Sequence, residues 1–172
     1  MGQSKGDSGK YASPKGQALL LIHPHLLEEG TVGRCMVVLN IAMIGSDELA
    51  KSIAKAADQR DVHTYVHKEM DDDGARILSL IRPAKYPERL PPFLNALSTA
   101  QVGILEVTEV NAALGEALVA FASAGIDNGV AVLNPTDGAW IDQDQVGMLL
   151  KQAGLAQWTF DTNDGPHIRE CI

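Results

Sequence analysis

Short β-branched runs with few charges recur along the chain, and most are followed by a stretch with helical spacing of apolar residues. The first run is VVLNIAMI at residues 37–44, which has the composition of a strand buried on both faces. Further runs stand at residues 101–107, 129–134 and 157–160. Strands that alternate with helices predict an α/β fold: a mostly parallel sheet with helices on both faces.

The stretches between these runs carry the helical signal. Apolar residues fall on one helix face in residues 47–59 (DELAKSIAKAADQ), 111–125 and 142–154, and a short helix is expected at 92–97. Gly125 is expected to end the helix that precedes it. Residues 62–81 differ, because alternating stretches flank the turn sequence MDDDG. This pattern predicts a β-hairpin, which adds an antiparallel strand to the sheet.

Size and charge limit the functions that fit the chain. Its 172 residues suit one domain with a full core. The net charge of −8 argues against a free-standing DNA or RNA binder, because phosphate contacts need a basic face; an RNA contact shared with another domain stays open. Cys35 and Cys171 are expected to be free thiols in a reducing cytosol. No apolar run approaches the roughly 20 residues that cross a bilayer, so we expect a cytoplasmic protein without membrane contact.

The first 35 residues differ in composition from the rest. MGQSKGDSGKYASPKG is rich in glycine, serine and lysine and predicts disorder. Pro24 interrupts the apolar stretch that follows, and the absence of a small-residue cleavage site argues against a signal peptide. Met36 directly precedes the first strand, so residues 1–35 are expected to be a disordered or non-native extension. The folded domain is expected at 36–172.

The loop after the first strand carries part of a phosphate-binding motif. A P-loop reads G-x-x-x-x-G-K-[ST], and MIGSDELAKS at 43–52 supplies Gly45, Lys51 and Ser52 in register. At such a helix start the lysine would reach the β- and γ-phosphates, and the serine would bind a magnesium ion. Ala50 stands where the second glycine belongs, and a glycine-like backbone there would cost about 1–2 kcal/mol. The alternative is an ordinary helix capped by Asp47, with Lys51 as a solvated charge.

The order of the downstream segments resembles the GTPase domain of SelB/EF-Tu-type translation elongation factors. It is most similar to archaeal SelB-like paralogues with degenerate nucleotide motifs. NIAMIGSDELAKSIAKAA stands as first strand, loop and helix, and YPERLPPFLNALSTAQVGILEV runs from the second switch into the fourth strand. GEALVAFASAGIDNGVAVLNPTD resembles the next helix, strand and guanine-recognition motif. The resemblance covers residues 37–160 and implies a P-loop NTPase-like fold.

The guanine-recognition motif is retained in part. NPTD stands where the family has N-K-x-D, so Asn134 and Asp137 match and Pro135 replaces the lysine. The Asp137 oxygens would accept the N1 and N2 hydrogens of guanine; the alternative is a polar turn that closes a strand. The resemblance thus implies a nucleotide site made of Gly45, Lys51, Ser52, Asn134 and Asp137.

The magnesium and switch motif has been replaced. RPAKY stands where the family has D-x-x-G followed by histidine, so Arg82, Lys85 and Tyr86 occupy the functional positions. We therefore expect weak or lost GTP and GDP binding, doubtful magnesium binding and no hydrolysis, since phosphoryl transfer depends on metal and positioning. No catalytic residue or metal ligand is assigned. His63 and His67 share a strand face, but no third ligand stands at zinc-like spacing.

The resemblance implies a translation-associated interaction module that contacts a tRNA, the ribosome or a sister elongation factor. Two alternatives stay open: an active GTPase completed by a partner, and a Rossmann-type dinucleotide-binding domain. The missing G-x-G-x-x-G and the early hairpin argue against the second. Residues 164–172 make at most two helical turns, so the family's last helix is expected to be cut short. Trp140 and Trp158 are expected to be packing residues.

Overall fold

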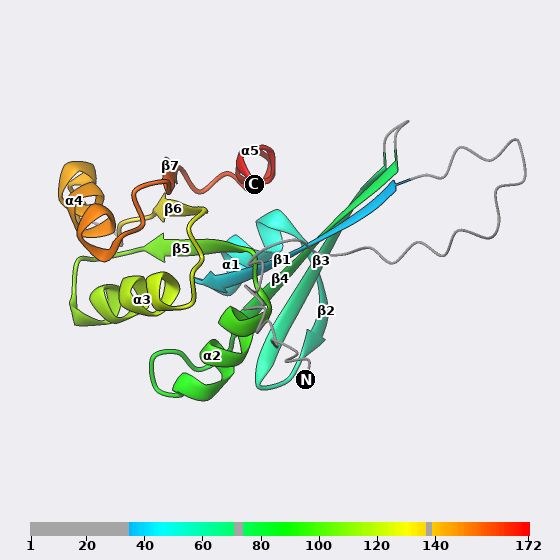
Figure 1. Cartoon of the computed structure of the whole chain (residues 1–172), viewed down its shortest axis with the longest axis horizontal. Coiled ribbons are helices and arrows are strands. Elements are labelled where there is room, and N and C mark those ends of the chain that lie inside the picture. The colour runs from blue at the N-terminus through cyan, green and yellow to red at the C-terminus, as the bar shows by residue number, and fades with distance from the viewer. Residues whose placement is uncertain (1–34, 71–73, 137–138) are drawn as a thin grey trace, which may run out of the picture. The chain divides into compact units, whose positions relative to one another are not determined.

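The computed structural model describes residues 35–70, 74–136 and 139–172, within the unit Arg34–Ile172. The strands of this part form one seven-stranded sheet in the order β2-β3-β4-β1-β5-β6-β7 (Figure 1). The strands are β1 Cys35–Ile44, β2 Lys55–Gln59, β3 Val62–Met70, β4 Gly74–Pro83, β5 Val102–Val107, β6 Gly129–Leu133 and β7 Thr159–Asp161. The helices are α1 Asp47–Ile53, α2 Leu90–Thr99, α3 Ala112–Ser123, α4 Gln143–Ala153 and α5 Gly165–Cys171.

The sheet is mostly parallel, as predicted. β1 lies at its centre and pairs in parallel with β4 on one side and β5 on the other, and β6 and β7 continue the parallel set. β3 runs antiparallel to β4, with Tyr65 opposite Leu80, which confirms the predicted hairpin. The hairpin turn at residues 71–73 lies outside the described residues.

Helices cover both faces of the sheet, which confirms that prediction. Buried side chains of α1 and α5 pack on one face around Ile41 and Tyr65. Those of α2, α3 and α4 pack on the other face around Phe93 and Phe121. β1 supplies both cores, because successive side chains of a strand point to opposite faces. Its buried residues Ile41 and Met43 belong to the first core and Ala42 to the second.

The first helix is shorter than predicted. Instead of running over 47–59, α1 ends at Ile53, and residues 55–59 form the edge strand β2, which pairs antiparallel with β3. The sequence KAADQ has good helix propensity, but all five of its residues are exposed. A longer helix would therefore bury no further apolar residue, whereas a strand satisfies the open backbone edge of β3. Tertiary pairing overrides local propensity here.

The remaining elements agree closely with the predictions. Gly125 (φ 73°) follows α3 and Gly154 (φ 90°) follows α4, both in the left-handed conformation that favours glycine at helix ends. The side chain of Trp158 is buried as expected, but the prediction for Trp140 is wrong, because that residue is 82% exposed. The expected N-terminal extension lies outside the described residues except for Cys35, which opens β1. No helix in the described part of the chain is long and apolar enough to span a membrane.

Candidate functional site

A cavity of about 300 Å³ lies where the parallel strands β1, β4 and β5 end. The loops after these strands and the start of α3 line it, including residues Gly45, Ser46, Arg82, Glu106 and Asn111. Open α/β sheets bind ligands in the crevice outside the carboxyl ends of their strands. The cavity therefore occupies the edge at which a site is expected for this fold.

Glu106 is the central polar group of this site. It is the penultimate residue of β5 and is only 8% exposed. Its carboxylate accepts hydrogen bonds from the backbone N–H of Ser46, from the Ser46 hydroxyl at 3.2 Å and from the Asn134 amide at 2.6 Å. Free N–H groups at a helix start are where a bound phosphate would accept. The protein's own carboxylate fills that position.

The approach of Glu106 explains the glycine at position 45. A Cβ atom on Gly45 would lie 2.8 Å from Oε2 of Glu106 and 2.9 Å from its Cβ, so a larger residue would displace the carboxylate. On the other side, Nε of Arg82 donates to the Gly45 carbonyl at 2.6 Å. The connection between β1 and α1 is thus fixed by two side-chain contacts, one from Glu106 to the Ser46 N–H and one from Arg82 to the Gly45 carbonyl.

The connection does not have the conformation of a P-loop. Helix α1 already begins at Asp47, and the Ser46 hydroxyl caps it by accepting from the Leu49 N–H at 3.1 Å. The alternative in which Asp47 is the cap is therefore wrong. Ala50 is fully buried within the helix, and no non-glycine residue of the described chain has positive φ. The strain expected at Ala50 does not arise, because the segment is helical.

Lys51 and Ser52 do not line the cavity. Lys51 forms an ion pair with Asp47 one turn earlier, and its side chain is 58% exposed. The Ser52 hydroxyl donates to the Leu49 carbonyl at 2.7 Å, and Ser52 lies against Gly165 of α5. The structure therefore separates these residues from Gly45.

Asn134 does come to the site, through Glu106, and its backbone N–H donates to the Val107 carbonyl at 3.0 Å. Asp137 lies outside the described residues. The structure thus unites Gly45 and Asn134 among the predicted residues. Nucleotide binding by the whole set stays a prediction.

Residues 82–86, which the resemblance compares with the switch motif, form structural contacts around the cavity. The Tyr86 hydroxyl donates to the Ala113 carbonyl at 3.3 Å, and its ring packs against Phe93 at a centroid distance of 4.8 Å. Arg82 also lies 3.3 Å from Nδ1 of His63. Lys85 is exposed. None of the side chains of Arg82, Lys85 and Tyr86 is a carboxylate.

A second acid lies at the start of α1, on the side facing the hairpin. Asp47 accepts a hydrogen bond from the hydroxyl of the buried Tyr65 in addition to its ion pair with Lys51. The Lys51 ammonium and then the Tyr65 hydroxyl lower the pKa of Asp47. Burial and the Asp47 carboxylate raise the pKa of Tyr65 to about 12. These contacts connect α1 to β3 and engage the Lys51 ammonium in an ion pair.

Sequence reasoning missed Glu106. The residue stands within QVGILEV, which was interpreted as a buried apolar strand. The available signal was the acid itself, because a carboxylate in a buried strand needs hydrogen-bond donors around it. Ser46 follows β1 and Asn134 follows β6, the two strands that flank β5. Both residues supply those donors.

Comparison with known proteins gives a relative but no family. No protein-family model matches the chain. It is similar to the uncharacterized protein MJ0325 of Methanocaldococcus jannaschii, with 25% identity over 133 residues, which is 77% of this chain and 41% of that protein. The chain thus spans about two fifths of the length of this relative. The similarity carries no activity to this chain.

Proposed function

We propose that this chain is a GTPase-like α/β domain that binds guanine nucleotide weakly or not at all, does not hydrolyse GTP, and acts as a translation-associated interaction module. The observation that carries the proposal is the position of Glu106. Its carboxylate sits on the free N–H at the start of α1 and on the amide of Asn134. The resemblance assigns Asn134 to guanine recognition, and the Ser46 N–H belongs to the loop after Gly45 that it assigns to phosphate binding.

The electrostatic cost of a phosphate at this position supports weak binding. A phosphate charge about 5 Å from the Glu106 carboxylate is repelled by about 3 kcal/mol at an effective dielectric constant near 20. That energy corresponds to a loss of roughly a hundredfold in affinity. Lys51, the cation that would offset the repulsion, is held in its ion pair with Asp47.

Loss of hydrolysis is supported by the identity of the residues after β4. Phosphoryl transfer needs a supported metal ion and an oriented water molecule. Arg82, Lys85 and Tyr86 stand at the positions that the resemblance assigns to these tasks. Arg82 donates to Gly45 and Tyr86 to Ala113, so both side chains are engaged in holding the loop and α3.

The sheet and its helices support the fold part of the proposal. An antiparallel hairpin beside a central parallel set, with helices on both faces, is what the resemblance to SelB/EF-Tu-type GTPase domains leads one to expect. The proposed kind of partner also rests on this resemblance. Among the tRNA, the ribosome and a sister elongation factor, the net charge of −8 favours a contact with protein over one with bare RNA.

Calorimetric titration with GDP, GTP and ATP, with and without magnesium, tests the nucleotide part. We expect either binding weaker than micromolar or no heat of binding up to millimolar nucleotide, because Glu106 occupies the anion position. Asp137→Ala serves as the matched variant, since it removes the predicted guanine contact alone. Micromolar guanine-specific binding that disappears in Asp137→Ala would overturn this part.

Co-sedimentation with archaeal ribosomes, with and without a purified sister elongation factor, tests the partner part. We expect the chain to pellet with ribosomes or with the factor–ribosome complex, and salt titration will show whether charge dominates the contact. Recovery of the whole chain in the supernatant under every condition would remove translation from the proposal.

A further inference from the structure

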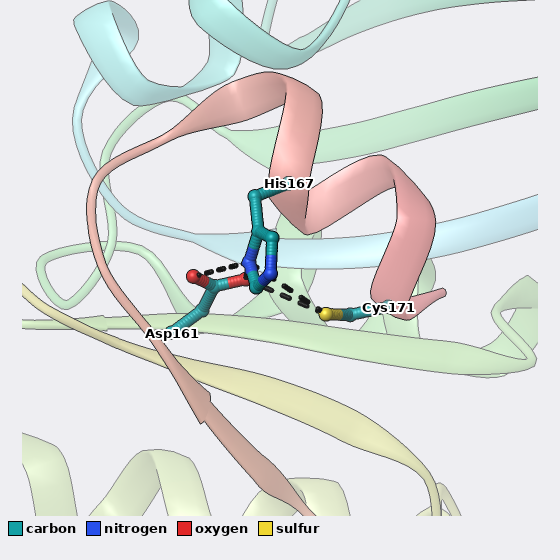
Figure 2. A group of neighbouring side chains, drawn as sticks. All are labelled: Asp161, His167 and Cys171. Atoms are coloured by element: carbon teal, nitrogen blue, oxygen red, sulfur yellow. Dashed lines mark hydrogen bonds and ion pairs between the residues drawn. The ribbon is translucent and has the colours of Figure 1, made fainter.

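Three side chains of metal-binding type converge at the end of β7, outside the site described above. Figure 2 shows Asp161 at the end of the strand, with His167 and Cys171 of α5 beside it. Nδ1 of His167 lies 2.8 Å from Oδ2 of Asp161. Sγ of Cys171 lies 3.6 Å from the same oxygen and 3.9 Å from Nδ1 of His167. One ligand atom from each residue thus falls within 4.8 Å of the others.

Local structure explains the convergence. His167 and Cys171 are four residues apart on α5, a spacing that places both on one helix face. Asp161 ends β7, and its side chain is only 3% exposed. Its Oδ1 accepts from the backbone N–H of Thr162 at 2.7 Å. This hydrogen bond orients the carboxylate, as hydrogen bonds to metal ligands commonly do. Nδ1 of His167 contacts both carboxylate oxygens, Oδ1 at 2.9 Å and Oδ2 at 2.8 Å, whereas the thiol of Cys171 contacts Oδ2.

The arrangement does not fit a cysteine nucleophile. In a catalytic relay, one imidazole nitrogen faces the thiol and the other faces the carboxylate. Here Cys171 and Asp161 both approach Nδ1 of His167. Burial and the neighbouring Asp161 also raise the pKa of the Cys171 thiol, whereas a nucleophile needs a lowered one.

The spacing and the chemistry of the donors fit zinc. Tetrahedral zinc with its usual bonds to sulfur, nitrogen and oxygen holds its ligand atoms roughly 3.4–3.6 Å apart. The separations of 2.8, 3.6 and 3.9 Å bracket this range, so small side-chain movements suffice. A thiolate, an imidazole and a carboxylate together favour Zn²⁺ over Mg²⁺ or Ca²⁺, which prefer oxygen ligands alone.

We propose that Asp161, His167 and Cys171 bind one Zn²⁺ ion. On binding, the thiol proton leaves to solvent, and Nδ1 of His167 gives up the proton that it shares with Asp161 while Nε2 carries the remaining one. Thiolate, neutral imidazole and carboxylate are then the three protein ligands. Three protein ligands leave the fourth position for water or an exchangeable ligand. A cavity of about 420 Å³ beside β7, lined in part by Gln143, Thr162 and His167, gives that position access. This inference is independent of the proposed function.

Cobalt spectroscopy on the full chain tests the site directly. The background protein carries His23→Ala, His25→Ala and Cys35→Ser, which removes two histidines outside the described residues and leaves Cys171 as the one thiol of the sequence. We expect added Co²⁺ to give a thiolate-to-cobalt charge-transfer band that one equivalent of Zn²⁺ abolishes. Cys171→Ser should lose the band, and Zn²⁺ should raise the Tm of the background protein but not of Cys171→Ser.

Calorimetric zinc titration of further variants separates ligands from general folding effects. His167→Ala and Asp161→Asn are expected to weaken zinc affinity by about tenfold or more, with circular dichroism in EDTA confirming that each variant is folded. His67→Ala is the matched control, because His67 lies in β3 beside Glu69 and is not one of the three cluster residues. A background protein without the charge-transfer band, or a His167→Ala variant that keeps the zinc affinity of the His67→Ala control, would overturn the proposal.

Discussion

Replacing Trp158 with alanine is expected to lower the free energy of unfolding by about 4 kcal/mol, the range for a large buried aromatic residue. The indole is 6% exposed and packs edge-on against Phe121 at a centroid distance of 5.0 Å. It lies directly over the glycines of neighbouring strands, since a Cβ atom on Gly103 or Gly129 would approach the ring to 2.5 Å. Its Nε1 donates to the Ile126 carbonyl at 3.2 Å. Alanine would remove these ring contacts and leave the space beside the two glycines empty.

Urea unfolding followed by circular dichroism measures the free energy of unfolding. In thermal unfolding, the Tm of Trp158→Ala should be lower by about 12 °C. Trp140→Ala is the matched control, because that tryptophan is 82% exposed and its loss should change stability by less than about 0.5 kcal/mol. A loss below about 1 kcal/mol for Trp158→Ala would contradict the packing described for β5, β6 and β7.

Glu106→Ala is expected to lower the free energy of unfolding by about 3 kcal/mol, because it leaves the Ser46 N–H and the Asn134 amide without their acceptor. Glu116→Ala is the control, since Glu116 is an exposed glutamate of α3. Urea unfolding of both variants gives the comparison. Equal stability of the two variants would contradict the hydrogen bonding assigned to Glu106.

The same variant tests whether Glu106 stands in for a phosphate. With the carboxylate removed, the N–H groups of Ser46 and Asn134 are free to donate to the oxygens of an added anion, so inorganic phosphate should raise the Tm of Glu106→Ala. Phosphate should change the Tm of the wild-type protein much less, because its anion position is filled. If phosphate changes the Tm of both proteins equally, Glu106 does not occupy an anion-binding position, although its hydrogen bonds can still stabilise the fold.

Much of the sheet was predictable because burial on both faces marks the central strands in the sequence. The runs that became β1, β5 and β6 contain little but β-branched and other apolar residues. β2 was not predictable in this way, since its strand state depends on the edge of β3 and not on its own residues. The hairpin of β3 and β4 was predictable because alternating apolar and polar residues flank a turn sequence, and both features lie within residues 62–81.

The sequence predicted the site residues correctly only where their position after a strand, and not a motif, determines whether they lie at the cavity. Gly45 and Asn134 each follow a parallel strand, so the sheet brings them to one edge. Lys51 and Ser52 were assigned from a motif that presumes an open loop, but the Ser46 cap starts the helix before them. The pair of His167 and Cys171 was visible as a helical spacing, whereas Asp161 joins them only because the chain turns back after β7.

The central place of β1 has a consequence for how the chain folds. β1 precedes every other described element, yet its partners β4 and β5 come much later, with Val38 opposite Ile77 and Met43 opposite Ile104. The β3–β4 hairpin needs only a short chain closure, whereas both partners of β1 require long ones, which are slow. We therefore infer that the hairpin forms first and that β1 docks onto it before β5 completes the centre. A chain arrested between these steps leaves the backbone edge of β1 around Met43 unpaired, and an unpaired strand edge promotes aggregation.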